Sequence, residues 1–566
     1  MDRRDRTDVA SARGKPDGPD FGSGEPNLPA PSAVTTPRPT TAANNSDVIA
    51  FVNAQIAEGW REHRLTASPQ ATDAEWCRRT YLRILGRIPT VAELLRFLDD
   101  AAQSKHVALV DRLLDSPAYR DSYARNWTSF WSNVLIGRSG GKKSDSKISR
   151  PGMRQYLREA LLENRPYDRM VHELVSATGS NRPGTPGFNG AVNFHLGNMQ
   201  DKAVTATTKT AQVFLGLQVQ CTQCHNHPFN DALQNRFWEL NAFFRQTQVV
   251  SAGGKGGRHY RLVNRDFSGE GKTATPQQAE IYYEGRNGKL QAVYPRFIDG
   301  TEIAKSGFVS TVDRRGELAT LISSSEWMPR AAVNRLWAHF FGFGLTAQLD
   351  DMGPHAGVSH PQLLDRLSKE FVASGYDLKR LMRWLALSDA FSLSSRQLAE
   401  NKSDDPLLGV AWFSRYYTRQ MRPEELYESL MTATEFDQAR MSYAALDDAK
   451  TDWLQQFTID LNTDECNEAS TFDGTVGQTL MMMNGRSLER IAGGEKHRLI
   501  ERLVADRNMS PETKLQYLYQ AALSRKARPR EIRMANDQLR QRGDMTETLQ
   551  DIWWVLLNSN EFILDH

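Results

Sequence analysis

Apolar residues recur at three- and four-residue steps along most of the chain that follows residue 46. The first of these stretches carries Ile49, Phe51, Val52, Ile56 and Trp60. Such spacing places the apolar side chains on one face of a helix. Stretches of the same kind fill residues 47–250 and return in residues 311–566. The pattern therefore predicts a mainly α-helical fold built from two helical halves.

Glycine and capping residues predict where several of these helices begin and end. The helix that contains Tyr81 should stop near Gly86. Thr90 and Glu93 have the spacing of a capping box, which opens the next helix. Ser359 precedes another apolar stretch, so we expect its side chain to cap the helix that follows.

Residues 251–310 interrupt the helical pattern. Two short runs at residues 280–284 and 290–297 flank Asn287 and Gly288, a dipeptide typical of tight turns. This arrangement predicts a β-hairpin. We therefore expect a small β insert or linker at residues 251–310, between the two helical halves.

The first 46 residues are rich in Pro, Ser, Thr, Gly and Asp and contain few large apolar side chains. Such a segment cannot bury enough surface to offset the entropy of ordering, so we predict a disordered N-terminal tail at residues 1–46. Residues 1–20 lack the apolar core of a signal peptide, so none is expected in this stretch.

Length and charge narrow the classes of protein further. The 566 residues exceed what one hydrophobic core usually serves, so more than one domain is expected. The formal net charge is only +2, which argues against a nucleic-acid-binding surface. No run of 18 or more apolar residues occurs, so we expect no transmembrane segment.

Two parts of the chain resemble each other. Tyr81, Gly86, Arg87 and Glu93 recur in order and spacing as Tyr519, Ser524, Arg525 and Glu531. Downstream, residues 113–119 resemble residues 556–562. Because two blocks match in the same order, we predict that both ends of the chain carry the same helical unit.

The stretch from Cys221 to His227 contains two of the four cysteines and two of the twelve histidines in the chain. Cys221, Cys224 and His225 have the spacing of covalent c-type haem attachment. In such motifs the two thiols bond the haem vinyl groups and the adjacent imidazole binds the iron. A redox function follows from this interpretation, either as an oxidoreductase or in electron transfer with an unidentified partner.

Two other interpretations of the motif remain open. Cys221 and Cys224, with His225 or His227, can supply three ligands of a tetrahedral zinc site whose fourth ligand lies elsewhere. The cysteines can also be a short-range disulfide or free thiols in a purely structural segment. In either case the chain is expected to be a non-enzymatic cell-envelope or binding protein.

Further residues are candidates for a distal haem ligand or for a second site. Candidate distal ligands are His195, Met199, His355, His360 and Met481 to Met483. Asp350 and Asp351 can combine with His339, His355 and His360 in a second cluster. Paired carboxylates with histidines are suited to metal binding or to acid–base chemistry. An aromatic stripe at residues 237–244 is expected to wall one side of the haem.

Several motifs resemble a known pair of domains. In the first half they are residues 79–86, 113–119 and 214–217, and in the second half residues 333–337, 341–345, 350–351, 359–361, 387–388 and 557–562. These segments are similar to two domains of unknown function that occur as a pair in planctomycetes, often with a separate planctomycete cytochrome-c domain. The resemblance implies an exported protein of the periplasm or cell envelope, with a link to polysaccharide use. It implies no particular reaction.

The motif itself departs from the family pattern, which usually reads Cys-x-x-Cys-His-Asp-His-Lys-Phe-Asp-Pro. Here Asn226, Pro228 and Asn230 replace an aspartate, a lysine and a second aspartate. An amide at residue 226 cannot act as the carboxylate partner of a histidine. No carboxylate-oriented imidazole is therefore expected at this position.

Overall fold

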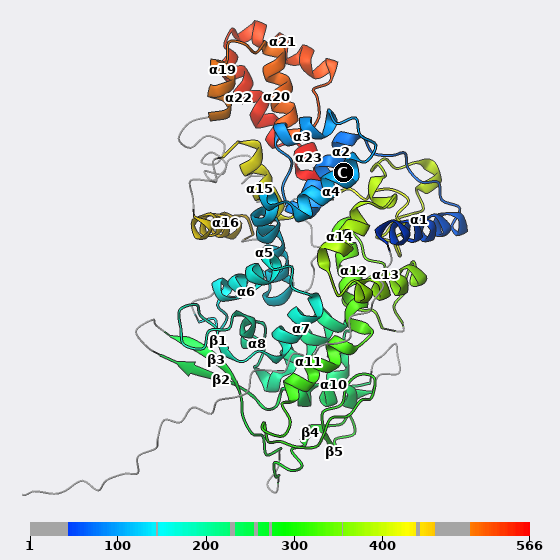
Figure 1. Cartoon of the computed structure of the whole chain (residues 1–566), viewed down its shortest axis with the longest axis vertical. Helices are drawn as coiled ribbons and strands as arrows, with labels where there is room; N and C mark the ends of the chain where they lie inside the picture. The colour runs from blue at the N-terminus through cyan, green and yellow to red at the C-terminus, as the bar shows by residue number, and fades with distance from the viewer. Residues whose placement is uncertain are drawn as a thin grey trace, which may run out of the picture. The chain divides into compact units, whose positions relative to one another are not determined.

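Helices make up most of the structure, a computed structural model in which the expected mainly α-helical class is confirmed (Figure 1). The structure describes residues 44–142, 145–226, 233–253, 258–270, 274–353, 355–436, 442–458 and 498–566. The domain boundaries expected at residues 250 and 311 stay predictions.

The helices of the first half are short to medium in length, and the longest is α1. They are α1 (Asn45–Glu62), α2 (Asp73–Leu85), α3 (Val91–Leu98), α4 (Lys105–Asp115), α5 (Arg120–Ile136), α6 (Arg150–Leu162), α7 (Tyr167–Ser176), α8 (Asn193–Leu196), α9 (Val204–Thr210) and α10 (Gln234–Asn241). A π-helical turn, Ala211–Leu215, continues α9.

The second half begins with helices around the apolar α12 and ends with a separate group. These helices are α11 (Arg314–Ser324), α12 (Trp327–Phe341), α13 (Pro361–Ala373), α14 (Leu378–Ala386), α15 (Pro423–Ala433), α16 (Tyr443–Thr458), α19 (Arg498–Ala505), α20 (Pro511–Leu523), α21 (Pro529–Arg542), α22 (Met545–Leu557) and α23 (Asn560–Ile563).

Short strands form three small antiparallel sheets. The strands are β1 (Gly179–Ser180), β2 (Thr247–Ala252), β3 (His259–Asn264), β4 (Ile281–Glu284), β5 (Leu290–Val293), β6 (Arg419–Gln420) and β7 (Leu564–Asp565). The sheet orders are β1–β3–β2, β4–β5 and β6–β7. The β4–β5 pair confirms the expected hairpin, and Gly288 in its turn has the positive φ of +74° that glycine tolerates.

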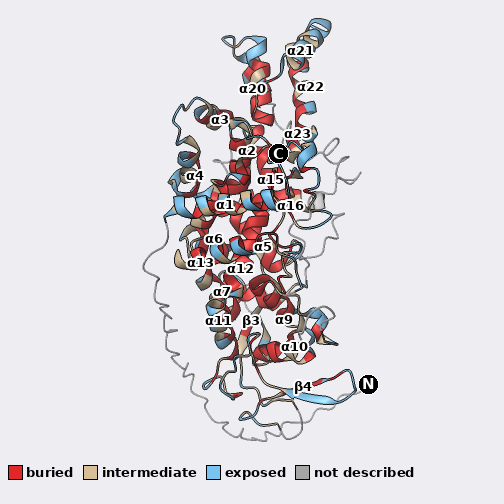
Figure 2. Ribbon diagram, turned by 90° about the vertical axis from the view of Figure 1, so that its right-hand side faces the viewer, coloured by how far each residue is buried: buried red, intermediate tan, exposed pale blue. Residues whose placement is uncertain are grey.

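The core consists of two clusters of buried apolar side chains, and α2 contributes to both. Trp76, Tyr81 and Ile84 belong to the larger cluster, which extends from α1 to Tyr417. Leu82 belongs to the smaller cluster, together with residues of α15, α19, α20 and α22. In Figure 2 the ribbons of α2, α5 and α12 are mostly buried, whereas the end of α21 is exposed. One helix near the N-terminus therefore packs against both the middle and the end of the chain.

The expected helix ends are confirmed at α2 and α3 but not at α13. Gly86 ends α2 in the left-handed conformation, and Thr90 and Glu93 form both bonds of the capping box of α3. Ser359 does not cap α13, so that prediction is wrong. The helix begins at Pro361 behind His360, and the Ser359 hydroxyl instead donates to the carbonyl of Leu345 at 3.2 Å.

The internal resemblance is confirmed in the local geometry. We call residues 72–119 the N-terminal unit and residues 510–562 the C-terminal unit. In each unit a residue with positive φ ends the first helix: Gly86 at +69° and Ser524 at +57°. A second helix follows within a few residues, α3 in one unit and α21 in the other. The same chain path therefore occurs twice.

Each unit also contains the same set of three interacting side chains. Arg87 donates two hydrogen bonds to Glu93, both 2.8 Å long, and Arg525 donates two to Glu531, both 2.9 Å long. The ring of the tyrosine six residues earlier lies 5.3 Å from the guanidinium in one unit and 5.4 Å in the other. We call these sets the latches: Tyr81, Arg87 and Glu93, and Tyr519, Arg525 and Glu531.

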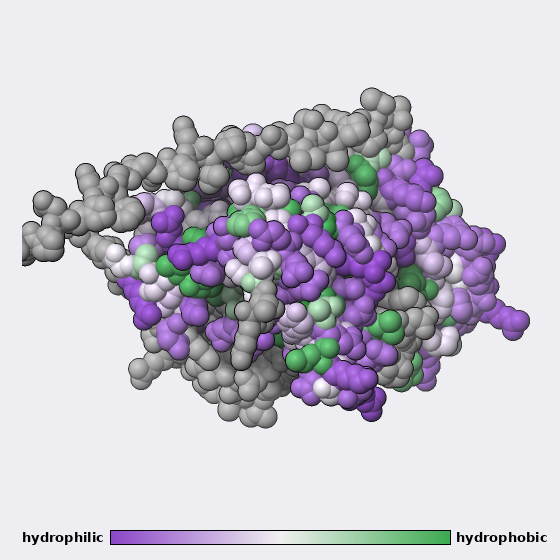
Figure 3. All heavy atoms as spheres, turned by 90° about the horizontal axis from the view of Figure 1, so that it is seen from below, coloured by the Kyte–Doolittle hydropathy of each residue, from purple (hydrophilic) through white to green (hydrophobic). Residues whose placement is uncertain are grey.

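The exposed surface is predominantly polar where Figure 3 displays it. Hydrophobic residues form small separate groups among hydrophilic ones on this face. Within the described ranges, no helix combines the length and the apolar character needed to span a bilayer.

Candidate functional site

The Cys–x–x–Cys–His motif begins on a single 3-10 turn, Gln220–Gln223. Cys221 lies in the turn and Cys224 directly follows it. A 3-10 helix has three residues per turn, so side chains three positions apart point to the same side. Both cysteines are exposed free thiols. The turn and the residue that follows it therefore carry two accessible thiols three positions apart.

Side chains from α10 and the end of β4 hold this turn in place. The carbonyl of Gln223 accepts hydrogen bonds from Trp238 Nε1 at 3.1 Å and from Gln234 Nε2 at 3.2 Å. Gln234 Nε2 also donates to the carbonyl of Glu284 at 3.1 Å. The Trp238 ring stacks on Tyr283 of β4. The exposed thiols thus sit on a turn that is fixed to both a helix and the β-hairpin.

Asn226 has a structural role that the sequence did not reveal. Its side-chain oxygen accepts a hydrogen bond from the backbone N–H of Gln234 at 3.0 Å, at the start of α10. This bond satisfies one of the free N–H groups that every helix N-terminus carries. Asparagine is a favoured capping residue, but the separation of eight positions between Asn226 and Gln234 hides this role from a local motif search.

His225 is partly exposed, and its ring has a defined hydrogen-bond partner. The ring Nδ1 lies 2.6 Å from the backbone carbonyl of Asn226. A carbonyl can only accept, so Nδ1 must carry the proton. In the neutral ring the other nitrogen, Nε2, then keeps its lone pair. The bond from Nδ1 to a backbone carbonyl is the usual way in which a metal-binding histidine is oriented.

A second loop is attached to the segment that leads into the motif. Gly216 has a φ of +64°, and its carbonyl accepts a hydrogen bond from the N–H of Met352 at 2.7 Å. A Cβ atom at Gly216 would lie 2.8 Å from the Met352 sulfur, so glycine is required for this contact. Gln218 Nε2 donates to an Asp350 carboxylate oxygen at 3.3 Å. Asp350 is thus connected to the segment before Cys221.

Asp351 and His355 form a pair within that second loop. The ring Nε2 of His355 lies 2.9 Å from a carboxylate oxygen of Asp351, and the two side chains are 20% and 15% exposed. Such a pair can orient an imidazole for proton transfer or for metal binding. The structure therefore brings two of the candidate residues together, in a loop that also contacts Gly216.

His195 and His339 are enclosed in the protein core. His195 Nε2 donates to the carbonyl of Val175 at 3.1 Å, and His339 Nε2 donates to the carbonyl of Arg83 at 2.9 Å. Burial lowers the pKa of both imidazoles well below the usual histidine value. These contacts are those of neutral, hydrogen-bonded core residues.

His360 and Met199 are likewise packed against other parts of the fold. His360 is buried, with Nδ1 3.0 Å from the Ser359 hydroxyl and its ring against that of Trp412. Burial, with a contribution from His63, lowers the pKa of His360 to about 4. Met199 is partly buried against the larger core cluster. The candidates His227 and Met481 to Met483 lie outside the described residues.

Two observations limit which of the candidate residues can belong to one metal or haem site. No group of three or more His, Cys, Asp or Glu side chains in the described ranges has the arrangement of a metal site. Most of the aromatic stripe at residues 237–244 faces the core: Phe237, Leu240, Phe243 and Phe244 are at most 1% exposed. The expectation that the stripe walls a haem is therefore wrong for these four residues. Trp238, which contacts the motif turn, is the partly exposed member.

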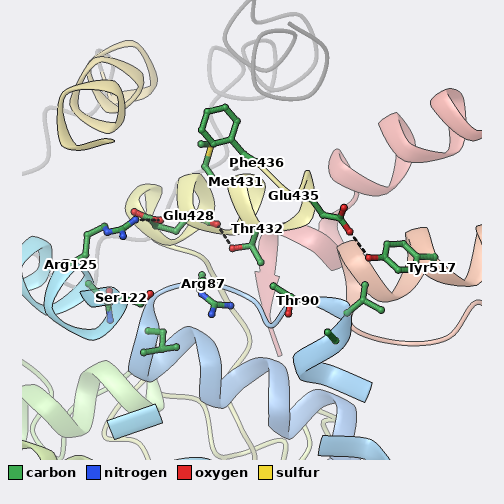
Figure 4. A pocket seen from close by; sticks show the side chains of 14 residues that line it. Arg87, Thr90, Ser122, Arg125, Glu428, Met431, Thr432, Glu435, Phe436 and Tyr517 are labelled. Atoms are coloured by element: carbon green, nitrogen blue, oxygen red, sulfur yellow. Dashed lines mark hydrogen bonds and ion pairs between the residues drawn. The ribbon is translucent and has the colours of Figure 1, made fainter. Parts of the chain in front are cut away.

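Cavities elsewhere in the structure are separate from the motif. One of about 440 Å³ lies between the N-terminal unit, α5, α15 and α20, and Arg87, Thr90 and Tyr517 are in its wall (Figure 4). Its charged groups already have partners, such as Arg125 with Glu428. Another cavity, of about 630 Å³, is lined by residues of α12 and of the segment 405–422. No motif residue lines either cavity.

Comparison with known proteins identifies the two halves of the chain. A family model described as PSCyt2, a protein of unknown function (DUF1549), matches residues 51–249, which include the motif. A second model described as PSD1, a protein of unknown function (DUF1553), matches residues 314–448. No curated protein and no solved structure matches the chain. The chain therefore combines these two domains of unknown function, in the order that its sequence motifs predicted.

Proposed function

We propose that the chain is a c-type haem protein with a redox function, in which Cys221 and Cys224 hold the haem and His225 binds the iron. The observation that carries this proposal is the contact of His225 Nδ1 with the carbonyl of Asn226. It leaves Nε2 as the free ligand atom, in the residue that directly follows the second of two exposed thiols in the chain. The haem, when bound, would supply one-electron chemistry.

The thiols are in the state that attachment requires. Cys221 and Cys224 would hold the haem through thioethers: each Sγ–H would add across one vinyl C=C bond, with a new carbon–sulfur bond and the hydrogen on the other vinyl carbon. No oxidant is consumed, but both cysteines must be reduced, and both are free. The hydrogen bonds from Trp238 and Gln234 to Gln223 fix the backbone between the two thiols.

The exposure of the motif favours electron transfer over chemistry in a closed pocket. Because Cys221 and Cys224 are exposed, a haem that they hold would be accessible to a partner protein. It could then exchange electrons with that partner without a substrate cavity. Covalent haem attachment takes place outside the cytoplasm, so the proposal also assigns the protein to the periplasm or cell envelope. Fractionation of the native cells tests that location.

A pyridine haemochrome spectrum tests the central claim. Protein made in an exporting host with haem-attachment machinery should show the α-band of a c-type haem, and the haem should stay with the denatured chain. The double variant Cys221→Ala, Cys224→Ala should lose it. Cys77→Ala is the matched control, because Cys77 is a free but fully buried thiol on α2. That variant should keep the haem.

The same samples distinguish the competing zinc site. If the wild type carries no covalent haem but contains one zinc ion per chain, lost in the double cysteine variant, the haem proposal fails. The alternative of a non-enzymatic protein with a metal-binding motif then holds. If neither haem nor metal is present, the motif is structural.

A further inference from the structure

A small cavity between α5, α6 and α16 is lined by more positive than negative side chains. Its volume is about 30 Å³. The charged residues that line it are Arg138, Lys142, Arg150, Arg154 and Glu424. It is therefore too small for a sugar or a nucleotide but has room for a small ion.

The positive charges in this cavity are only partly neutralised. Arg138 Nε donates to Glu424 at 3.2 Å, and Arg154 forms an ion pair with Asp447. Arg150 donates to the backbone carbonyl of Gly140 at 2.8 Å instead of to a carboxylate. Among the described residues neither Arg150 nor Lys142 has an acidic partner. Four cationic side chains thus face two carboxylates, which leaves two positive charges.

Two of the arginines of α6 in this cavity also repel each other. Arg150 and Arg154 are four residues apart, so they lie on the same face of the helix, where like charges repel. Burial, together with the neighbouring Arg154, lowers the pKa of Arg150 to about 10. Burial and Arg150 also lower the pKa of Lys142. A negative charge in the cavity would relieve both effects.

Hydroxyl groups in the wall supply an independent sign of a missing ligand. Ser132 is 1% exposed and Ser129 is 7% exposed, and both line the cavity from α5. Within the part of the chain that the structure describes, their Oγ atoms have no hydrogen-bond partner, and neither has Nε of Arg154. Buried polar atoms in native proteins are almost always paired with protein groups, water or a ligand. Here three unpaired donors lie around one cavity.

We propose that this cavity binds a doubly charged tetrahedral oxyanion, inorganic phosphate or sulfate. Two charges match the excess of cations, and the oxygens would accept from the serine hydroxyls and from the guanidinium groups. Arginine is the residue best suited to such oxygens, because its donors are planar and remain charged. Lys142 is the exposed one among the charged residues that line the cavity.

Titration calorimetry and thermal unfolding of the full chain test the site. Phosphate or sulfate should bind with one ion per chain and raise the unfolding temperature in a saturable way at millimolar concentration. Chloride at equal ionic strength should do neither. Binding of one oxyanion alone identifies which of the two the cavity accepts. Equal stabilisation by all three salts, with no saturation, would overturn the proposal.

Two variants separate ligand binding from folding. Ser132→Ala removes an unpaired buried hydroxyl, so the anion-free protein should unfold at the same or a higher temperature. The anion should bind it at least about fivefold more weakly, since charge-neutral hydrogen bonds have this strength. Arg154→Gln should weaken binding more, by at least about tenfold. Wild-type affinity in both variants would contradict the site.

Arg158→Gln is the matched control. Arg158 is on the same helix and carries the same charge, but it pairs with Asp121 at 2.7 Å and does not line the cavity. Its removal should leave anion affinity within about twofold of the wild type. An equal loss of affinity in Arg158→Gln and Arg154→Gln would show only general charge attraction and overturn the proposal. The double cysteine variant should bind the anion normally, so this test is independent of the haem.

Discussion

The N-terminal and C-terminal units share their latches but differ in how they are joined to the rest of the protein. When Tyr81 is aligned with Tyr519, the buried arginines of α2 fall on other residue types in α20. The aligned pairs are Arg78 with Gln516, Arg79 with Tyr517, and Arg83 with Ala521. The shared residues close the turn between two helices. The arginines that occur only in α2 all form contacts with residues that are far away in the sequence.

Each of the three arginines of α2 contacts residues that are far away in the sequence. Arg78 donates to the carbonyls of Ala522 and Phe562, and Arg79 to those of Phe391 and Leu393. Arg83 pairs with Asp565 at 2.9 Å and with Glu425 at 3.3 Å. The comparison thus separates two kinds of interaction: latches that build a unit, and arginines that fix one unit within the fold.

Removal of the central arginine should have the largest effect. The side chains of Arg83, Glu425 and Asp565 are each only 1% exposed. Arg83→Met would remove the cation that the two buried carboxylates share, while Arg419 stays 3.6 Å from Asp565 and Arg422 stays 2.8 Å from Glu425. We expect the free energy of unfolding to fall by about 3 kcal/mol, the lower end of the cost of breaking a buried ion pair from one side, because each carboxylate keeps a second arginine. Denaturant titration of purified protein measures this loss.

Two further variants make that measurement specific. Arg61→Met removes an exposed arginine from α1 whose partner Glu58 is also exposed, so it should cost less than about 0.5 kcal/mol. Adding Asp565→Asn to Arg83→Met should cost less than the sum of the single changes, because the buried charge then disappears. If Arg83→Met lowers the free energy of unfolding by less than about 1 kcal/mol, the arginines that join α2 to distant segments contribute no more than the latches do.

The latches should contribute to stability in both units. Arg87→Met and Arg525→Met each remove a bidentate, partly buried ion pair and a ring contact, and Arg525→Met also removes the ion pair with Glu561. Each should lower the free energy of unfolding by about 1–2 kcal/mol, with the larger loss in Arg525→Met. Arg96→Met, on the exposed face of α3, is the control and should have little effect. If only one of the two variants is less stable than the wild type, the structural likeness of the latches does not extend to their contributions to stability.

The features that sequence alone predicted are those with nearby determinants. Gly86, Thr90 and Glu93 lie within one turn of the structure that they specify, so their spacing is sufficient. The same holds for the hairpin around Gly288 and for the grouping of Cys221 with Cys224. Each needs only the local chain and general stereochemistry.

Features that depend on distant residues were not predictable. Arg83 and Asp565 pair across nearly the whole sequence, and nothing in either segment indicates the partner. Ser359 has the sequence of a cap, yet contact with Leu345 determines where its hydroxyl points. His195 resembles a ligand in the sequence, but burial beside Val175 makes it a core residue. Tertiary packing overrides the local signal in each case.

On acidification, the two latches should lose similar amounts of the stability that they contribute. Burial opposes the charge of Glu93 and Glu531, but hydrogen bonds with Arg87 and Arg525 outweigh it and lower both pKa values. A carboxylate with a lowered pKa contributes stability above its unfolded-state pKa, about 4.3, that is lost as pH falls through the lower folded-state pKa.

Neutral variants isolate that contribution. Glu93→Gln and Glu531→Gln should each be less stable than the wild type at pH 7, and the difference should shrink by up to about 1 kcal/mol between pH 5 and pH 3. Unfolding by urea at several pH values measures it. A constant difference across this range in one variant would show that its glutamate is not held by the latch.

The smallest effect should come from transferring a feature of one unit to the other. Arg525 also pairs with Glu561, where the aligned residue in the N-terminal unit is the exposed Ala118. Ala118→Glu would give Arg87 a second carboxylate and should raise the free energy of unfolding by about 0.3–0.5 kcal/mol at low salt. Ala118→Gln, which has the same shape without the charge, should add less. Because a surface ion pair is screened, the gain should vanish in about 1 M salt; a gain that persists there would come from helix propensity instead of from the latch.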